Sequence, residues 1–394
     1  MGTDRFLFRF CLGFLFFAIA LTYYERGGAC LSPSSPDFER CILDSDFVHH
    51  FAAARLFAEG HGAEAYSSPS LAGKMQELGK GGIDPAAFRA TVNLPTMMLA
   101  LRPLAGLPLR TAWFLFILAG ATAYFFMAWL WGRWLGVAAA AGFAGVWHTV
   151  SSGQNGLLIG GLLGLGLGLM ERTPRLAGVL FGLCSIKPQF GLLLPIVFLA
   201  GRCWPTFVSA VVTVVVLVLC SLVFPGGAVV WQGYFSEGMA NGQGLLVTLD
   251  IIPRFASVYG ALVQQGVVVR LALWFQLASA VLALAAAVLV WWRTQDIHLR
   301  TASVIFATLV SIPLVYDYDL PIAFAGALAF APLVCQGGPA LLALPAIALL
   351  YLFPALYYPH GVHWPSVQLL PGSFWILLLL CVRLSRIERF RISR

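Results

Sequence analysis

Long apolar runs, separated by short polar breaks, follow one another along the whole chain. Runs of about 17–25 residues are long enough to cross a hydrocarbon core of about 30 Å as helices. The pattern predicts an all-α polytopic membrane protein in which residues 1–394 form a single integral membrane domain. About 12 spans are expected, near residues 6–24, 92–108, 111–131, 135–150, 156–170, 176–200, 205–224, 267–292, 301–315, 319–335, 340–356 and 371–384.

The positions of the arginines predict which breaks face the cytoplasm. Arg5 and Arg9 lie at the start of the first run, and the end of the last run and the tail after it are rich in arginine, at Arg383, Arg386, Arg389, Arg391 and Arg394. By the positive-inside rule both termini are cytoplasmic, which agrees with an even number of crossings. The first run, 6–24, is longer than the 7–15 apolar residues of a signal peptide, which favours an anchor.

The middle of the chain does not follow simple alternation. Arg133 and the stretch 171–175 resemble cytoplasmic breaks by their charge, yet strict alternation from the first span places both outside. One resolution is that residues 176–200 form a re-entrant pair of half-helices with Lys187 and Pro188 at the tip. The topology of residues 92–200 stays open at this point.

Two loops are long enough to fold outside the membrane. The first periplasmic loop, 25–91, contains a stretch, 47–57, whose apolar residues recur at helical spacing, which predicts an interfacial amphipathic helix. The second loop, 225–265, is rich in glycine and carries aromatic residues suited to the headgroup level, Trp231, Tyr234 and Phe235. Cys30 and Cys41 lie in the first loop, where they either form a disulfide or stay as two thiols.

Composition supports the membrane interpretation and excludes other classes. The chain is 60% hydrophobic and 10% charged, whereas soluble domains carry about 25% charged residues. The net charge of +7 does not indicate a nucleic-acid partner, because no folded basic surface is expected outside the membrane. The eight cysteines include no CxxC pair, and a cysteine metal site is therefore not indicated.

Two carboxylates precede the predicted interfacial helix. Asp46 is a candidate general base, because a carboxylate at the mouth of the bundle can take a proton from a sugar hydroxyl. Asp44 is a candidate substrate-binding residue beside it. The alternative is helix capping, in which Asp44 or Ser45 satisfies free N–H groups at the start of the helix.

Lys187 and Gln189 lie deep inside an apolar run. An ammonium group cannot remain in lipid without a partner, so Lys187 must face a cavity, pair with an acid or reach the interface. Binding the phosphate of an anionic lipid would satisfy it, and the kink at Pro188 would free backbone groups to help. The alternative is a structural ion pair with Asp317 or Asp319.

Two further polar stretches interrupt apolar runs. The first contains Gln154 and Asn155, whose amides could bind sugar hydroxyls or could simply belong to a turn. The second is a candidate substrate-binding stretch or a polar turn with aromatic belt residues, and it contains Tyr316, Asp317, Tyr318 and Asp319. His148 is expected to be packed rather than catalytic. Asp46 could share a divalent ion with Asp317 and Asp319, but a metal is not favoured.

Several of these stretches, taken in order, resemble glycosyltransferase family 87, whose members are polytopic, have the GT-C fold and use polyprenyl-phosphate sugars. The resemblance covers most of the chain and rests on Asp46-Phe47 with Ala53, Gly60 and Tyr66; Leu94-Pro95-Thr96 and residues 102–108; Gly153-Gln154-Asn155-Gly156; Ala177-Gly178 with Lys187-Pro188-Gln189; and Tyr316-Asp317-Tyr318-Asp319-Leu320. It implies that Asp46 acts as the base, and that Lys187 and Gln189 belong to the region that holds the lipid phosphate.

The resulting prediction is a membrane glycosyltransferase in a bacterial inner membrane, with its active site toward the periplasm. A hexose, mannose as the expected sugar, would pass with inversion from a polyprenyl-phosphate donor to a glycan or glycolipid acceptor. A lipid-linked donor needs no nucleotide pocket, and the chain has no glycine-rich nucleotide fingerprint. The alternative is a transporter or flippase of a lipid-linked or small anionic substrate, although no internal repeat supports it.

Overall fold

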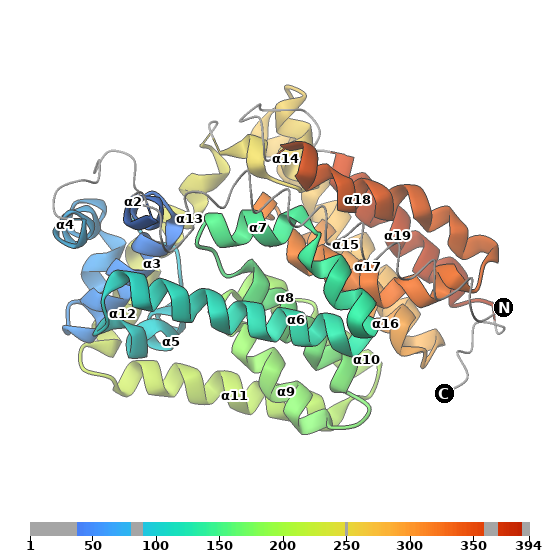
Figure 1. The fold of residues 1–394 in the computed structure, drawn as a ribbon, viewed down its shortest axis with the longest axis horizontal. Coiled ribbons are helices and arrows are strands. Elements are labelled where there is room, and N and C mark those ends of the chain that lie inside the picture. Colours follow the sequence, from blue (N-terminus) through green and yellow to red (C-terminus); the bar gives the residue numbers. More distant parts are fainter. Residues whose placement is uncertain (1–37, 80–89, 249–250, 358–368, 388–394) are drawn as a thin grey trace.

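The computed structural model describes residues 38–79, 90–248, 251–357 and 369–387, and within these ranges the chain forms helices and no strand. The all-α prediction is confirmed. An elongated bundle of long helices carries a cap of shorter helices over one end, at the left of Figure 1. Cys41 is disulfide-bonded, whereas Cys30 and the expected first span, 6–24, lie outside the described residues.

The cap joins helices of the first loop to helices of the second. The first part consists of α2 (Phe38–Leu43), α3 (Asp46–Ala58), the 3-10 turn η1 (Gly62–Tyr66), α4 (Ser68–Leu78) and α5 (Pro95–Ala105). The second part consists of α12 (Gly227–Gly233), the π-helix η5 (Tyr234–Gly238) and α13 (Met239–Leu246). The rings of Tyr66 and Tyr234 lie 5.9 Å apart and connect the two parts.

Helix α3 is present where the apolar spacing predicted a helix, but its apolar residues are covered by protein. Phe47 and Phe51 pack into the core of the bundle, while Val48 and Leu56, on another side, pack with residues of α4 and α5. Protein therefore covers both sides. The apolar face of α3 serves packing between cap and bundle rather than contact with lipid.

Helix α5 does not form the span expected near 92–108. It contains 11 residues, which gives a length of about 16 Å at 1.5 Å per residue, about half of a hydrocarbon core of about 30 Å. It packs against α3 in the cap. The apolar run there reflects burial in protein.

The runs expected at 111–131 and 135–150 form two arms joined by a sharp turn. Helix α6 (Leu109–Ala141) includes Arg133 with φ 54° and ψ −146°, which is not helical. A Cβ placed on Gly136 would lie 2.3 Å from the carbonyl oxygen of Ala128, so the chain folds back on itself at Arg133. Helix α7 (Ala144–Ser151) follows the second arm.

The segment 176–200 folds back on itself as the re-entrant interpretation predicted. It consists of α9 (Pro174–Leu183), the 3-10 turns η3 (Cys184–Ile186) and η4 (Pro188–Gly191), and α10 (Leu194–Ala200). The rings of Phe181 and Phe198 lie 4.9 Å apart, whereas a continuous helix would separate the two residues by about 25 Å. Lys187 joins the two turns at the tip of this hairpin.

These two reversals place the central basic residues together. Helix α8 (Gly156–Leu169) runs beside the first arm of α6, with Gly161 against Ala123 and Gly164 against Met127. It starts next to Tyr318 and extends about 21 Å away from it. Arg133 and the 171–175 stretch therefore lie at the same end of the bundle, away from the cap.

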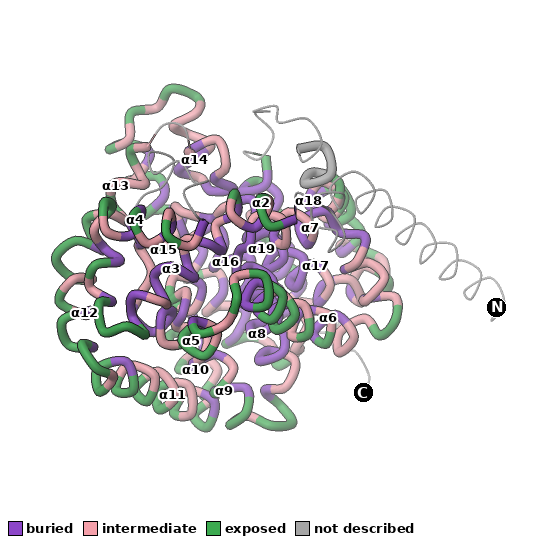
Figure 2. Tube along the Cα trace, turned by 60° about the vertical axis from the view of Figure 1, so that its left-hand side comes forward, coloured by how far each residue is buried: buried purple, intermediate pink, exposed green. Residues whose placement is uncertain are grey.

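The remaining helices complete the bundle around α16 (Ile297–Ser311), which is buried along most of its length. They are α11 (Trp204–Val223), α15 (Val269–Arg293), α17 (Leu320–Cys335), α18 (Leu344–Tyr357) and α19 (Leu370–Leu384), with α14 (Val258–Gln264) and the 3-10 turns η6 (Ile252–Arg254), η7 (Asp317–Asp319) and η8 (Gly338–Ala343) between them. Figure 2 shows the buried residues gathered along α8, α16, α17 and α19, with α11 exposed on the outside.

Fewer helices than expected are long enough to cross a membrane. Among the described residues, four qualify by length and composition: Leu109–Ala141, Trp204–Val223, Val269–Arg293 and Asp317–Cys335. The other apolar helices have 10–17 residues. The expected number of about 12 spans is therefore not confirmed.

Candidate active site

Asp46 is the first residue of α3, and its carboxylate does not cap the helix. The residue before it, Ser45, makes no side-chain capping bond and donates its hydroxyl to the carbonyl of Ile42 instead. The Asp46 carboxylate accepts a hydrogen bond of 2.8 Å from the Gln154 amide. Asp44 is 72% exposed and pairs with Arg40 at 3.9 Å, so the structure does not bring Asp44 to the site.

The turn after α7 reaches Asp46 because of a glycine. The Asp46 amide donates to the carbonyl of Ser152 at 2.9 Å. Gly153 has φ +62°, and a Cβ on it would lie 2.7 Å from the Cβ of Phe47. Only glycine combines this left-handed conformation with so close an approach. The turn therefore places Gln154 against the carboxylate.

Lys187, at the tip of the α9–α10 hairpin, pairs with Asp319. Its Nζ lies 2.5 Å from Asp319 Oδ1, and the side chains are 12% and 0% exposed. The ammonium also lies 5.0 Å from the ring centroid of Tyr318 and 5.3 Å from that of Phe190. The sequence offered an ion pair and a cavity as alternatives for Lys187; the structure contains both.

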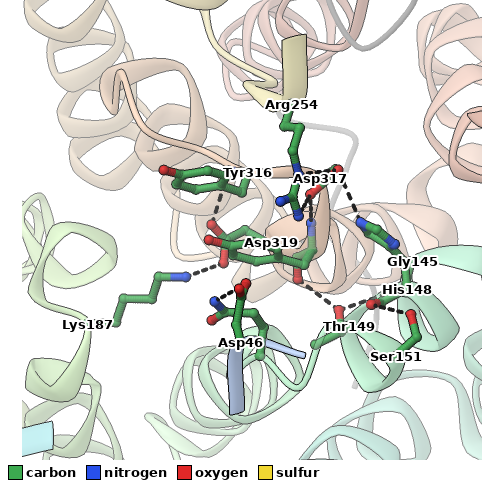
Figure 3. A network of polar contacts seen from close by, with 12 residues as sticks. Asp46, Gly145, His148, Thr149, Ser151, Lys187, Arg254, Tyr316, Asp317 and Asp319 are labelled. Atoms are coloured by element: carbon green, nitrogen blue, oxygen red, sulfur yellow. Dashed lines mark hydrogen bonds and ion pairs between the residues drawn. The ribbon is translucent and has the colours of Figure 1, made fainter. Parts of the chain in front are cut away.

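Asp317 is held by two basic side chains. Arg254 Nε donates to Asp317 Oδ2 and Nη2 donates to Oδ1, each at 3.1 Å, and His148 Nε2 lies 3.1 Å from the same Oδ2. Figure 3 shows Arg254 and His148 meeting Asp317 from different elements, with Lys187 and Asp46 nearby. Burial opposes the charged form of Arg254, but the contacts with Asp317 outweigh it and raise the pKa of Arg254 above its usual value.

Arg254 and His148 are functional candidates that sequence reasoning did not select. Arg254 is a single arginine in a glycine-rich loop and carries no motif, while His148 was expected to be packed. An isolated bridge between Phe255 and Tyr316 brings the loop to the turn before α17, and the Ala256 amide donates to the carbonyl of Val315 at 2.7 Å. This long-range pairing brings Arg254 to Asp317, and that contact indicates a role for Arg254.

The turn at residues 316–319 is a buried structural element rather than a belt at the membrane surface. The rings of Tyr316 and Tyr318 stack at 4.9 Å with an angle of 8° between them. The Tyr316 amide donates to Asp319 Oδ2 at 3.1 Å, and the Thr149 hydroxyl donates to the carbonyl of Tyr318 at 2.8 Å. These bonds orient both aspartates toward the basic residues.

A cavity of about 400 Å³ lies between these elements, within the roughly 300–1,000 Å³ common for small-molecule sites. Seven of the predicted site residues line it: Asp46, Gln154, Asn155, Lys187, Gln189, Tyr316 and Tyr318. Arg254, His49, His50 and Asn93 also line it, together with apolar residues from the hairpin and both loops. Asp317 and Asp319 do not line the cavity but hold Arg254 and Lys187 at its wall.

A sequence model of glycosyltransferase family 87 matches residues 92–315, more than half of the chain. The chain belongs to glycosyltransferase family 87. The resemblance found in the short motifs is thereby confirmed, and the protein is a membrane glycosyltransferase with a sugar donor and an acceptor. No curated protein and no solved structure matches the chain.

The family 87 match and the cavity overlap only in part. Gln154, Lys187 and Arg254 fall within the matched residues, but Asp46 precedes them and the turn at 316–319 follows them. The fold brings all of these groups to one cavity. Family membership and the position of Asp46 are therefore independent observations.

The acids of this family 87 site do not gather as a metal cluster. Asp317 and Asp319 bind Arg254 and Lys187, and Asp46 is bound by Gln154. Among the described residues, no group of three or more His, Cys, Asp or Glu side chains could hold a metal ion. The arrangement suggested by the sequence, with a divalent ion shared by the three aspartates, is not assembled.

Proposed function

We propose that this family 87 protein transfers a hexose, mannose in the first instance, from a polyprenyl-phosphate donor to a hydroxyl of a glycan or glycolipid acceptor. One observation carries the proposal: the Asp46 carboxylate and the Lys187 ammonium line the same cavity of about 400 Å³. A base for the acceptor and a cation for the leaving phosphate are thus available to one bound substrate.

Asp46 is the proposed general base. Its Oδ2 accepts a hydrogen bond from Gln154, while Oδ1 makes no hydrogen bond with any residue that the structure describes and can accept the acceptor hydroxyl. As the acceptor oxygen forms its bond to the anomeric carbon, its proton passes to Asp46, and the bond from that carbon to the phosphate oxygen breaks. A single displacement of this kind inverts the anomeric centre.

Lys187 and Arg254 are the proposed ligands of the departing phosphate, with Gln189 beside them. Lys187 uses one N–H on Asp319, and an ammonium has three. Arg254 uses Nε and Nη2 on Asp317, which leaves the rest of its guanidinium for the ligand. Since both cations are fixed before the reaction, they stabilise the charge that develops on the phosphate without reorganising.

The apolar part of the cavity wall suits a lipid-linked donor. It is formed by Leu94, Ile186, Pro188, Leu245, Ile251 and Leu314. Polar groups and cations occupy the remainder of the wall, so an anionic headgroup and an apolar chain each meet matching surface. This favours a polyprenyl-phosphate sugar over a water-soluble nucleotide sugar.

The expected orientation is an active site at the periplasmic face of a bacterial inner membrane. Exposed arginines are more numerous at the end away from the cap, at Arg133, Arg172, Arg175, Arg202 and Arg293, than toward the cap, at Arg40, Arg102, Arg110 and Arg270. By the positive-inside rule this end faces the cytoplasm, which leaves the cap and the cavity on the periplasmic side. A lipid-linked donor would enter from the membrane.

The test is product formation by purified protein. Labelled polyprenyl-phosphate sugars, mannose first, are incubated with the enzyme and a membrane extract, and the product is identified by mass spectrometry and its anomeric configuration by NMR. A new glycoside with inverted configuration is expected. A retained configuration excludes the single displacement. Uptake of the lipid into proteoliposomes without a covalent product would favour a transporter.

A further inference from the structure

We propose that His50 and Gln154 form a positioning relay that holds the Asp46 carboxylate in one orientation for the acceptor hydroxyl. The inference rests on the proposed function and extends it, because it assigns roles to two residues that need not touch either substrate. It also gives Gln154 a role different from the two that the sequence suggested, which were direct binding of the sugar and membership of a turn.

A chain of three hydrogen bonds leads to the carboxylate. Asn93 Nδ2 lies 3.1 Å from His50 Nδ1, and His50 Nε2 lies 3.4 Å from Gln154 Oε1. Gln154 Nε2 donates to Asp46 Oδ2 at 2.8 Å. These hydrogen bonds thus join α3, the turn after α7 and the segment before α5, which come together only in the folded protein.

Chemistry allows one direction for these bonds. An ionised carboxylate only accepts, so the NH₂ group of Gln154 must face Asp46 and its carbonyl oxygen must face His50. His50 Nε2 then carries a proton and donates. His50 Nδ1 is left as an acceptor, which matches the NH₂ group of Asn93. Every position in the chain is filled by a complementary group when His50 is neutral.

The surroundings of His50 maintain this neutral form. His50 is 7% exposed and lies in α3, within the cap. Burial, and after it the neighbouring His49, lowers the pKa of His50 from 6.5 to about 4. A protonated ring would direct a second N–H at the NH₂ group of Asn93 and break the chain. Burial and hydrogen bonding therefore select the same state.

The far end of the relay is anchored in the cap. Asn93 Nδ2 also donates to the Thr91 hydroxyl at 3.1 Å, and the Tyr66 hydroxyl donates to the carbonyl of Asn93 at 2.8 Å. Tyr66 is 1% exposed. Hydrogen bonds therefore connect the Asp46 carboxylate, which lies at the start of a helix, to the buried interior of the cap.

The first experiment removes the hydrogen bonds of His50 and keeps its volume. His50→Leu is expected to lower kcat by about 10- to 100-fold, because a shift of about 1 Å at a catalytic group has an effect of that size. The apparent donor KM should change little. His50→Gln retains an N–H donor and should recover most of kcat. The exposed His61→Gln variant, with thermal unfolding of each protein, is the control.

The double variant separates a relay from a structural role. If His50 acts through Gln154, His50→Leu combined with Gln154→Ala has the same kcat as Gln154→Ala alone, because residues that act as one unit are not additive. Independent losses that multiply in the double variant would overturn the proposal, as would a wild-type kcat in folded His50→Leu protein.

The variant Gln154→Glu tests the relay through the pH dependence of kcat/KM, which would not change if Gln154 served only for packing. A second carboxylate beside Asp46 disfavours its ionised form and should shift the acid limb of the kcat/KM profile upward by about one pH unit. An unmoved limb would contradict the relay. The other titratable groups facing Asp46 are His49, His50, Lys187, Arg254, Tyr316 and Tyr318.

Asp46→Asn distinguishes failure of the relay from failure of the proposed function. If Asp46→Asn is as active as wild type, Asp46 is not the base and the relay has nothing to position. If Asp46→Asn is inactive while His50→Leu and Gln154→Glu behave as wild type, the base assignment stands and only the relay is wrong.

Discussion

Lys187 Nζ lies 2.5 Å from Asp319 Oδ1, and the Asp319 side chain is fully buried. The pair links the tip of a re-entrant hairpin to the turn before α17, two segments separated by 132 residues. Neither charge is stable at its position without the other, because an isolated ion is strongly disfavoured in a buried site. The same pairing directs the ammonium to the wall of the cavity. The stability of the fold and the placement of the ammonium for the proposed phosphate binding therefore depend on the same ion pair.

Removing Lys187 alone should affect both stability and donor use. Lys187→Met leaves Asp319 buried and unpaired, which costs about 3–5 kcal/mol of unfolding free energy. The double variant Lys187→Met/Asp319→Leu should regain most of that stability, since apolar replacement of a buried pair is often neutral, but should not regain activity. Chemical unfolding in detergent and the apparent donor KM measure the two effects. Recovery of both would show that the pair is only structural.

Asp46→Asn should lower kcat by about 10²- to 10⁴-fold, the usual contribution of a general base. The matched control is Asp44→Asn, since Asp44 is 72% exposed and pairs only loosely with Arg40 at 3.9 Å. We expect Asp44→Asn to have wild-type activity. Initial rates with a labelled lipid-phosphate sugar make the comparison. Equal activity of the two variants would remove Asp46 from the mechanism.

Arg254→Lys should raise the apparent donor KM while the protein stays folded. Lysine keeps the charge but cannot reproduce the two parallel bonds of 3.1 Å to Asp317, because only the guanidinium has the fork geometry. We expect a loss in kcat/KM of about 10-fold, corresponding to one charge-assisted bond. Arg172→Lys, at the opposite end of the bundle, should leave kcat/KM unchanged. The same KM for both variants would exclude a role for Arg254 in donor binding.

Gly153→Ala should reduce activity by displacing Gln154 from Asp46. Alanine at φ +62° places its Cβ 2.7 Å from Phe47 Cβ, and either the turn or α3 must move. The left-handed conformation adds about 1 kcal/mol of strain. Gly73→Ala is the control: Gly73 lies in helix α4 with no atom within 4 Å of the added Cβ, so alanine should stabilise the helix by up to about 1 kcal/mol. Thermal unfolding and initial rates test both.

His50 should make the folded state less stable in mild acid. Because its pKa in the folded protein is about 4, below the ordinary 6.5, the unfolded chain binds the proton more readily between these values. The contribution is present above about pH 6.5 and is lost as the pH falls toward 4. Denaturant midpoints of wild type and His50→Gln should therefore converge as the pH is lowered from 7 to 4. A constant difference across that range would contradict the assignment.

Much of the fold follows from local pattern, and the errors have a common cause. The helix at α3 was predicted from apolar spacing. The reversal of 176–200 around Lys187 was one interpretation suggested by the charge pattern and by a lysine and a proline inside an apolar run. The expected span at 92–108 is not formed, and the apolar face of α3, which was expected to lie in the membrane interface, packs against protein. In both cases, apolar residues that could face lipid face protein instead, and hydropathy does not distinguish the two.

The sequence predicted many of the residues of the candidate site but not which of these residues contact one another. Asp46 and Lys187 stood out because ionisable groups within or beside apolar runs are costly. Arg254 did not, because an arginine in a polar loop is unremarkable until Asp317 is seen beside it. Similarly, His50 and Gln154 are 104 residues apart, and nothing near either residue in the chain indicates that they meet.

The amino-acid sequence alone determined that the chain is a helical membrane protein with a few polar groups among apolar runs, because a backbone in lipid must satisfy its own hydrogen bonds within each segment. That requirement is local and can be read from neighbouring residues. The tertiary structure alone decided which acid meets which base and which amide faces Asp46. Such pairings depend on distance and direction between segments far apart in the chain, and a buried charge or amide acquires a defined role only when its partner is in place.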